Sequence, residues 1–207
     1  MLEHYGRVGP ASATREKLLS AAERLLAERG SAATSVRDVL AAAGVANASA
    51  VGYYFGSKEA LVSAVERRAV DRVNAGRVAG LAALGGAPAL EDLVRAWAAP
   101  LVELSCSGRG PATAQVFTRI FDEPREQWAA NGAQDAIDVG WTYVRASAPH
   151  LPAGDDGELL WRWQSVTAVL AFYARGFLQP FGAPSRPEDA GTHLSRLVPQ
   201  CAALLRA

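Results

Sequence analysis

Side chains that bind phosphate gather in the first third of this 207-residue sequence. Tyr53, Tyr54 and Lys58 lie close together in the chain, and Arg15 and Arg37 lie upstream of them, near the starts of two predicted helices. Tyrosine hydroxyls, lysine and arginine side chains and free helix N-termini are the groups that hold phosphate oxygens and fix a helix in register. These residues predict a surface that binds a phosphate-bearing partner.

Helices must position these side chains, because strand signals are nearly absent. Alanine and leucine recur with glutamate and arginine in blocks that glycine and proline interrupt, a pattern typical of an all-α protein. Helices are expected over residues 14–29, from Ser35 to residue 43, over residues 48–55 after an N-cap at Asn47, and from Lys58 onward. Ser35 and Asp38 form a capping box, and Ser57 caps the fourth helix, whose apolar stripe is Leu61, Val65, Ala69 and Val73.

Beyond a glycine-rich break at residues 84–88 the predicted helices become longer. They cover residues 90–104, 113–121, 125–148, 158–177 and 189–205, and glycine or proline breaks separate them. We expect two domains, residues 1–58 (ordered from about residue 12) and residues 59–207, with the fourth helix linking them.

The charge balance excludes several classes of protein. The chain holds 21 Lys+Arg against 21 Asp+Glu, and 50% of it is hydrophobic, which supports a buried core and excludes a disordered tail or a histone-like polycation. Residues 1–74 carry 10 Lys+Arg and 8 Asp+Glu, a net charge of 10 − 8 = +2, so a few placed contacts must bind phosphate. No apolar run is as long as a membrane helix and the first residues lack a signal sequence, so we expect a cytoplasmic protein.

The second and third predicted helices, with a glycine-centred turn between them, form a helix-turn-helix, which presents its second helix to the DNA major groove. The segments around them carry a more specific pattern: TREKLL (14–19), AERG (27–30), TSVRD (34–38), AGV (43–45) and YYFGSKEAL (53–61). In this order and spacing, over about residues 12–65, they resemble the N-terminal domain of TetR-family transcriptional regulators. The remaining two thirds resemble the family in layout alone, as an all-helical ligand-binding and dimerisation domain.

The resemblance implies roles for individual residues on the DNA. Ser35, Tyr53, Tyr54 and Lys58 match phosphate contacts, and Arg37 matches a reader of guanine. Base readout falls on the third helix and its start, and the full expected DNA-binding set is Arg15, Ser35, Arg37, Asn47, Ala48, Ser49, Gly52, Tyr53, Tyr54 and Lys58. The sequence departs from the common pattern in a longer turn at residues 45–47 and in Gly52, where many members have a large side chain. Val51 and Phe55 are expected in the core.

Most aromatic residues follow the glycine-rich break, and they have two interpretations. Large rings can simply fill a helical core, or they can line a ligand cavity that a few polar groups orient. For the cavity we predict lining residues Trp97, Phe117, Phe121, Trp141 and Trp163, with Gln164, Arg119 or Arg162 as the polar groups.

The resemblance also implies assembly and mechanism. The last two helices would pair with those of a second copy, and the stripe suited to this packing is Leu194, Leu197, Val198, Cys201, Leu204 and Leu205. The expected protein is a homodimeric repressor that binds a palindromic double-stranded DNA operator and is released by a small apolar or aromatic effector, with no membrane partner.

Other functions remain open alternatives at this point. Cys106, beside a Ser-Gly loop, could make the protein a redox-sensing regulator, and the aromatic pocket could belong to a helical enzyme. The sequence has no phosphate-binding glycine loop, no nucleophile and base at recognisable spacing and no clustered metal ligands. We therefore expect neither an enzyme nor a metal or other cofactor.

Overall fold

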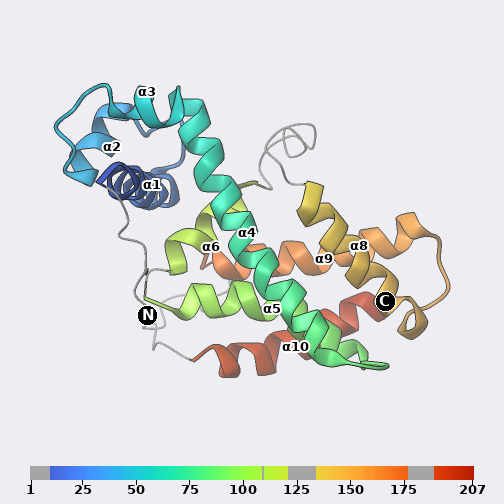
Figure 1. The fold of residues 1–207 in the computed structure, drawn as a ribbon. Helices are drawn as coiled ribbons and strands as arrows, with labels where there is room; N and C mark the ends of the chain where they lie inside the picture. Colours follow the sequence, from blue (N-terminus) through green and yellow to red (C-terminus); the bar gives the residue numbers. More distant parts are fainter. Residues whose placement is uncertain (1–9, 109, 121–133, 177–188) are drawn as a thin grey trace, which may run out of the picture. The chain divides into compact units, whose positions relative to one another are not determined.

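The computed structural model describes residues 10–108, 110–120, 134–176 and 189–207, and within these residues every regular element is helical. Figure 1 shows their arrangement in the chain. The elements are α1 (Pro10–Arg29), α2 (Val36–Ala43), α3 (Ala50–Phe55), α4 (Lys58–Leu84), α5 (Leu90–Cys106), α6 (Gly110–Arg119), α8 (Gln134–Ser147), the 3₁₀ turn η2 (Ala148–His150), α9 (Asp156–Ala174) and α10 (Ala190–Arg206). The all-α prediction is confirmed.

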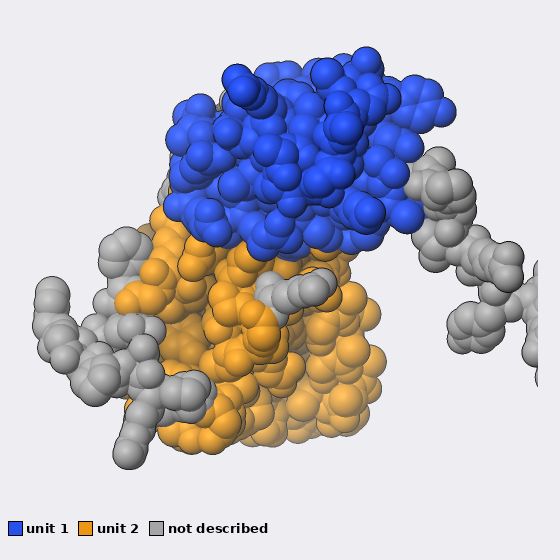
Figure 2. All heavy atoms as spheres, turned by 90° about the vertical axis from the view of Figure 1, so that its left-hand side faces the viewer, with its two compact units in different colours: residues 1–66 blue, residues 67–207 orange. Residues whose placement is uncertain are grey.

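The chain forms two compact units, coloured separately in Figure 2: Met1–Glu66 and Arg67–Ala207. The division falls inside α4, so this helix belongs to both units. The predicted division at residues 58 and 59 lies at the start of the same helix. No helix of the described residues is both long and apolar enough to cross a membrane.

The first unit is built around α1. Its buried residues Leu18, Ala22 and Leu26 repeat at i, i+4 and i+8, which places them on one face of the helix. Val39 of α2 and Val51 of α3 are also buried, and α2 packs against both α1 and α3. The predicted stripe of α4 is confirmed, because Leu61, Val65, Ala69 and Val73 are all buried.

The second unit is organised around α5. Helices α6, α9, α8 and α10 all pack against α5, and the contact with α10 is the most extensive. Among the residues of α5, those that are fully or almost fully buried include Leu93, Val94, Ala98, Leu101 and Val102. A helix surrounded in this way forms the core of the unit.

Most predicted helix boundaries agree with the structure to within a turn. The largest differences are at helix starts: α1 begins at Pro10 and α6 at Gly110, earlier than expected. Proline at the first position of α1 is consistent with helix entry, because its missing N–H has no intrahelical partner there. The expected start of a helix at residue 125 and the expected end of another at residue 177 lie outside the described residues.

Candidate nucleic-acid interface and effector site

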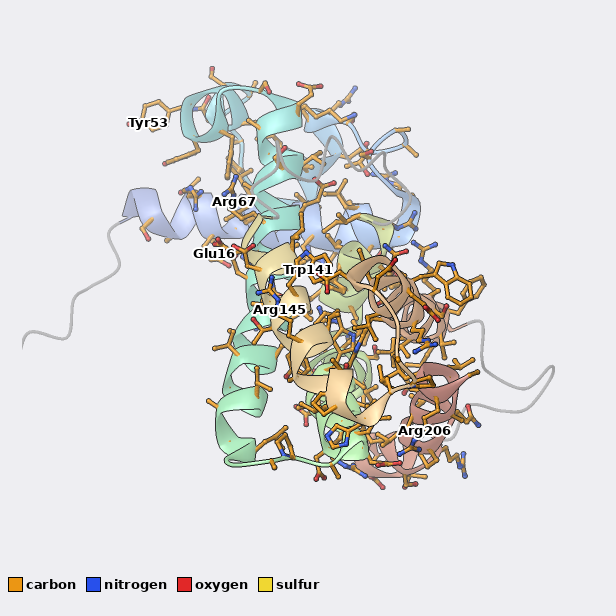
Figure 3. All side chains as sticks on the ribbon, turned by 90° about the vertical axis from the view of Figure 1, so that its right-hand side faces the viewer. Glu16, Tyr53, Arg67, Trp141, Arg145 and Arg206 are labelled. Atoms are coloured by element: carbon orange, nitrogen blue, oxygen red, sulfur yellow. The ribbon has the colours of Figure 1, made fainter. Side chains whose placement is uncertain are left out.

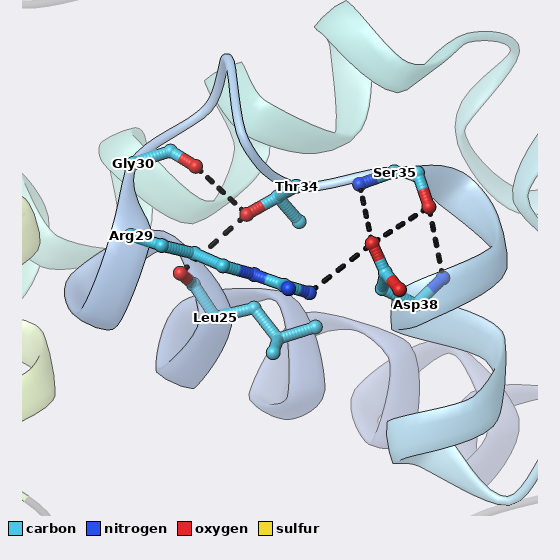
Figure 4. Close-up of polar contacts among 6 residues, drawn as sticks. All are labelled: Leu25, Arg29, Gly30, Thr34, Ser35 and Asp38. Atoms are coloured by element: carbon cyan, nitrogen blue, oxygen red, sulfur yellow. Dashed lines mark hydrogen bonds and ion pairs between the residues drawn. The ribbon is translucent and has the colours of Figure 1, made fainter.

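A polar network joins the end of α1 to the start of α2 (Figure 4). The Arg29 guanidinium lies 3.1 Å from the Asp38 carboxylate, and the Thr34 hydroxyl donates to the carbonyl of Gly30 at 2.7 Å. The capping box is confirmed: the Ser35 hydroxyl accepts from the Asp38 N–H, and the Ser35 N–H donates to the Asp38 carboxylate at 3.0 Å. The network fixes the direction in which α2 leaves α1, a role that the sequence had not indicated for Arg29.

The same contacts bear on the predicted role of Ser35. Its hydroxyl also donates to the Asp38 carboxylate at 2.7 Å, so both donors of Ser35 are used inside the protein. These hydrogen bonds lower the pKa of Asp38 below its usual value and keep the carboxylate ionised. A phosphate contact from the Ser35 hydroxyl would therefore have to break its bond to Asp38. At the other end of α2, Gly44 takes a left-handed conformation (φ 64°) that closes the helix.

Helix α3 presents one face to solvent and buries the other. Ala50 and Val51 are buried at 2% exposure each, whereas Ser49, Gly52 and Tyr53 are exposed. Residues 46–48 before the helix are exposed as well. The predicted base-reading residues are thus on one accessible surface, held by the buried face of the same short helix.

The predicted N-cap of α3 needs a correction. The structure begins α3 at Ala50 and puts Ser49, not Asn47, in the N-cap position. The Asn47 side chain instead accepts a hydrogen bond from the Ser49 N–H at 3.0 Å, which stabilises the turn ahead of the helix. An asparagine side chain can accept a hydrogen bond from the N–H two residues ahead either at a helix N-cap or in a turn. The sequence alone therefore did not distinguish an N-cap from a turn at Asn47.

The aromatic residues at the C-terminal end of α3 lie near the basic residues Arg15 and Lys58. Tyr53 is 80% exposed and points away from the first unit in Figure 3, and its ring contacts the edge of Tyr54 with the centroids 4.9 Å apart. Phe55 is only half-buried, and the Arg15 guanidinium covers its ring at 5.0 Å from the centroid. Lys58 is the first residue of α4, next to Ser57, whose hydroxyl caps that helix. This surface therefore combines the exposed Tyr53 and Arg15 side chains with the half-buried Tyr54 and Lys58 around α3.

In the second unit three aromatic rings from three helices pack together. Trp97 of α5 lies edge-on to Tyr143 of α8 and to Trp163 of α9, with centroids 5.1 and 5.4 Å apart. The Trp163 indole N–H donates to the Ser147 hydroxyl at 2.8 Å. All three rings are buried, so in this structure they form closed packing rather than the wall of an open cavity.

A buried arginine of α4 lies against this cluster. The guanidinium carbon of Arg77 is 3.4 Å from the centroid of Trp97 and 5.3 Å from that of Phe117. Its Nε–H donates to the carbonyl of Trp97 at 3.2 Å, and the Tyr143 hydroxyl donates to the carbonyl of Arg77 at 2.6 Å. Burial lowers the pKa of Arg77 to about 9 and raises that of Tyr143 to about 12, because both charged forms lose water.

The predicted pocket residues are only partly brought together. Trp97, Phe117 and Trp163 are buried beside Arg77 or in its ring cluster, but Trp141 is half-buried and lies against Arg145 (Figure 3), 5.8 Å from its guanidinium carbon. Gln164 is exposed, which is a correction to its predicted orienting role. Phe121 lies outside the described residues.

Neither predicted arginine provides an unpaired polar group for the pocket. Arg162 is buried but bonds the Glu158 carboxylate at 2.6 Å and the Pro152 carbonyl at 3.1 Å, so its charge is already used. Arg119 is exposed at the end of α6. The charged residue that does lie against the rings is Arg77.

Arg77 was not among the predicted pocket residues, although the sequence contains a signal for it. The apolar stripe of α4 repeats every four residues, and the next position after Val73 is Arg77. The same spacing puts Asn74 after Val70, and both polar residues are buried. A charged residue at a position that periodicity assigns to the core indicates a buried polar site.

The predicted dimerisation stripe of α10 also needs a correction. Five of its six members, Leu194, Leu197, Val198, Cys201 and Leu205, are buried within the same chain, where α10 packs on α5. Leu204 alone is exposed, at 40%. The large exposed apolar residues of this region are instead Trp161 and Phe172 of α9.

The two cysteines differ in environment. Cys201 is buried, which raises its pKa to about 11 and keeps the thiol protonated at neutral pH. Cys106 is exposed, with its Sγ 3.7 Å from the Tyr173 hydroxyl, and both thiols are free. Within the described residues no group of three or more His, Cys, Asp and Glu could hold a metal ion.

Solved structures of similar fold include regulators and a superantigen. A bacterial regulatory protein in the tetR family from Rhodococcus RHA1 aligns with a TM-score of 0.70 and 18% identity, over 94% of this chain and 97% of that one. The TetR family transcriptional regulator PfmR from Thermus thermophilus aligns at 0.60 and 19%, over 91% and 96%. The superantigen PfiT aligns at 0.60 and 22%, over 92% and 97%, so this likeness establishes the fold alone.

Sequence models of protein families give the more specific result. No curated protein is similar enough in sequence to count as a match. The model of bacterial regulatory proteins of the tetR family, however, matches residues 18–65, the helix-turn-helix region. A second model, of the tetracyclin repressor-like C-terminal domain, matches residues 95–203, more than half of the chain. With a helix-turn-helix unit followed by a helical second unit, and a family model matching each, the chain belongs to the TetR family of bacterial transcriptional regulators.

Proposed function

We propose that this protein is a dimeric, effector-responsive repressor that binds a palindromic operator through α3 and the residues around it. The observation that carries the proposal is that α3 is buried on one face and exposed on the other. Ala50 and Val51 hold the helix to the core, while Ser49, Gly52 and Tyr53 remain accessible on the opposite face. A short rigid helix of this kind fits the major groove and can bring its exposed residues to base edges.

Phosphate contacts beside α3 would set its depth in the groove. Tyr53 and Tyr54 supply hydroxyls, Lys58 and Arg15 supply charge, and Arg37 is exposed on α2. Asn47, Ala48, Ser49 and Gly52 then face the bases. Ser35 contributes mainly by capping α2, because its donors already bond Asp38.

Binding of the purified chain to an operator selected from a randomised duplex pool tests these roles. Tyr53→Phe removes one hydroxyl, and Lys58→Ala removes one charge. Each should weaken binding by about tenfold or more, because each removes a charge-assisted hydrogen bond to phosphate. Lys58→Ala should also reduce the slope of log affinity against log salt by about one per protomer. Arg95→Ala, which removes an exposed charge of α5, is the control. Unchanged binding in both test variants would contradict the proposed contacts.

The dimer interface is proposed on α9 and the exposed end of α10, which pack on each other. Trp161 is 66% exposed and Phe172 55% exposed, and with Ala168 between them they repeat at i, i+7 and i+11 along one face. Exposed large aromatic residues on one face are typical of an interface. A second copy of the same chain covers this face in an isologous dimer, with the two α3 helices about one DNA turn (~34 Å) apart.

Sedimentation of two variants tests this interface. Trp161→Glu with Phe172→Glu should produce monomers at micromolar concentration, because two charges replace apolar contacts at the centre of the interface. Val78→Glu is the matched control, since Val78 is also an exposed apolar residue but lies on α4. A double variant that sediments as the wild type does would place the interface elsewhere.

Effector control follows from the same layout. A ligand in the second unit would favour a conformation of α4 in which the two α3 helices no longer fit the operator, and a coupling of ~1–3 kcal/mol suffices to release the DNA. Since the partner is DNA, the site of action is the cytoplasm.

A further inference from the structure

The surroundings of Arg77 contain polar groups that packing alone does not satisfy. Among the buried atoms of the described residues, Arg77 Nη2, Trp97 Nε1 and Asn74 Oδ1 have no hydrogen-bond partner. The three residues are 3%, 6% and 7% exposed. The guanidinium stacks on Trp97, so the two unpaired donors belong to one place, and Asn74 lies one turn away from Arg77 along α4.

We infer that these groups form the binding site for the carboxylate of the effector, an organic acid with an apolar or aromatic body. The inference rests on the proposed effector-responsive function and adds the chemical class of the ligand. Buried polar atoms in proteins are normally satisfied, so the two unpaired donors, one of them on a cation, indicate an absent acceptor. A carboxylate accepts hydrogen bonds from both donors, Arg77 Nη2 and Trp97 Nε1.

The charge of Arg77 supports an anion over a neutral ligand. No carboxylate of the described residues pairs with Arg77, although its side chain is almost completely buried. Even with its pKa lowered to about 9, the guanidinium is charged at neutral pH. Arg162 shows the usual arrangement by contrast, because it is similarly buried but paired with Glu158. A bound carboxylate would give Arg77 the counter-charge that Arg162 already has.

The rings beside Arg77 define the rest of the ligand. Trp97 and Phe117 flank the guanidinium, and the buried Tyr143 and Trp163 continue the apolar surroundings. Because these rings are in contact in this structure, a ligand can enter only when a ring moves aside. Arg77 is also part of α4, the helix that begins at Lys58, so a ligand that holds Arg77 acts on a helix with a proposed DNA contact.

Acids and their uncharged amides of nearly the same shape show whether binding depends on the negative charge of the ligand. The tryptophan fluorescence of the full chain is followed during titration with phenylacetate and hexanoate, with the uncharged phenylacetamide and hexanamide, and with the cation phenethylammonium. At least one acid should change the emission and bind at least about tenfold more tightly than its amide, and the cation should not bind. Equal binding of each acid and its amide, or no response to either acid up to about 10 mM, would overturn the inference.

Variants test which residue holds the acid. Arg77→Met removes the charge, and Trp97→Phe removes the indole N–H while keeping a ring and leaving Trp163 as the reporter. Arg77→Met should abolish acid binding without lowering the melting temperature, since it removes an unpaired buried charge. The control Arg162→Met breaks a buried pair, so it should lower the melting temperature and leave acid binding intact. Should Arg77→Met also lose stability, Arg77→Lys decides, because its retained charge must restore the preference for acid over amide.

Two results would reassign Arg77. Acid binding that survives Arg77→Met would show that the arginine only packs on Trp97. Asp122 and Glu123 lie outside the described residues, and an Asp122→Asn, Glu123→Gln variant tests whether one of them serves as an internal counter-charge. Wild-type acid binding in that variant supports the inference, whereas acid binding that appears only there would overturn it.

The regulator proposal can fail separately. Fluorescence titration needs no DNA, so an acid that binds while the ligand-free protein selects no operator supports the acid site and contradicts the proposed repressor. Conversely, a protein that binds an operator but neither acid supports the proposed regulator and contradicts the acid site. Acid binding that lowers operator affinity, with both effects lost in Arg77→Met, supports both proposals together.

Discussion

The contact between α4 and α5 depends on a glycine, which gives a sharp test of how the second unit is packed. A Cβ atom at Gly76 would lie 2.7 Å from both Cβ and Cγ of Pro100. Real Cβ atoms do not approach other atoms so closely, and the proline ring cannot rotate away as a flexible side chain would. Gly76→Ala must therefore push α4 and α5 apart.

Two opposing effects set the size of this change. Alanine improves helix propensity by ~1 kcal/mol over glycine, whereas overpacking costs ~1–3 kcal/mol or more. With overlap at two atoms of a rigid ring we expect the cost to dominate, with a net loss of about 1–2 kcal/mol. For a chain of this size that lowers the melting temperature by roughly 2–8 °C.

Thermal and urea unfolding of four proteins measures the effect: the wild type, Gly76→Ala, Pro100→Gly and the double variant. Pro100→Gly removes both Cβ and Cγ, so if the clash is the cause this variant should relieve it, and the cycle should give a coupling of about 1 kcal/mol or more. A stabilised Gly76→Ala, or single effects that simply add, would refute the proposed close contact of the two helices.

Three further outcomes follow from individual residues. Gly52 is an exposed helical glycine, and a Cβ atom added there would meet no other atom within 4 Å, so Gly52→Ala should stabilise the free protein by about 0.5–1 kcal/mol. If the α3 backbone approaches the bases closely there, the same variant should bind its operator more weakly in a gel shift. The lowered pKa of Asp38 means that its carboxylate stabilises the fold above the usual aspartate pKa and that this contribution disappears as the pH falls through the lowered value. Urea unfolding of Asp38→Asn between about pH 2 and 5 should therefore lack that acid-dependent loss, and an unchanged pH profile would remove Asp38 as its source. A thiol reagent should modify the exposed Cys106 rapidly in the native protein and the buried Cys201 only on unfolding, and rapid reaction of both thiols would contradict the packing of α10 on α5.

The first unit could be predicted closely because its signals are local. The capping box needs only Ser35 and Asp38, the end of α2 needs only Gly44, and the buried stripe of α4 is visible as a four-residue repeat. The contact between Arg29 and Asp38 was not visible, since it depends on how α1 and α2 pack and not on the pattern within either helix. The prediction that Asn47 is the N-cap of α3 was wrong because its side chain can accept from the same N–H either in a turn or at a helix cap.

The second unit was less predictable because apolar patterning does not say which neighbour covers a face. The stripe of α10 has the composition of a dimer interface, but α5 of the same chain covers it. Conversely, α9 has apolar residues around much of its circumference, so its exposed face at Trp161 and Phe172 could be separated from its buried face at Trp163 and Leu170 only in the folded chain. The pocket prediction selected aromatic residues for their size and overlooked Arg77, whose position in the four-residue repeat was the stronger evidence.

The distribution of charge in the first unit limits how strongly it can attract DNA. Residues 1–66 hold seven Lys+Arg and seven Asp+Glu, so the first unit has no net positive charge to attract DNA. Residues 39–58, however, contain no acidic side chain, and they form the turn and helix α3 that carry the proposed base contacts. The turn and α3 therefore present phosphates with no carboxylate of their own, and the flanking carboxylates are Asp38, which pairs with Arg29, and Glu59, which lies next to Lys58. In the proposed dimer, weak overall attraction would make operator binding depend on the simultaneous fit of both α3 helices, so that a small displacement of α4 by a ligand at Arg77 would be enough to release the DNA.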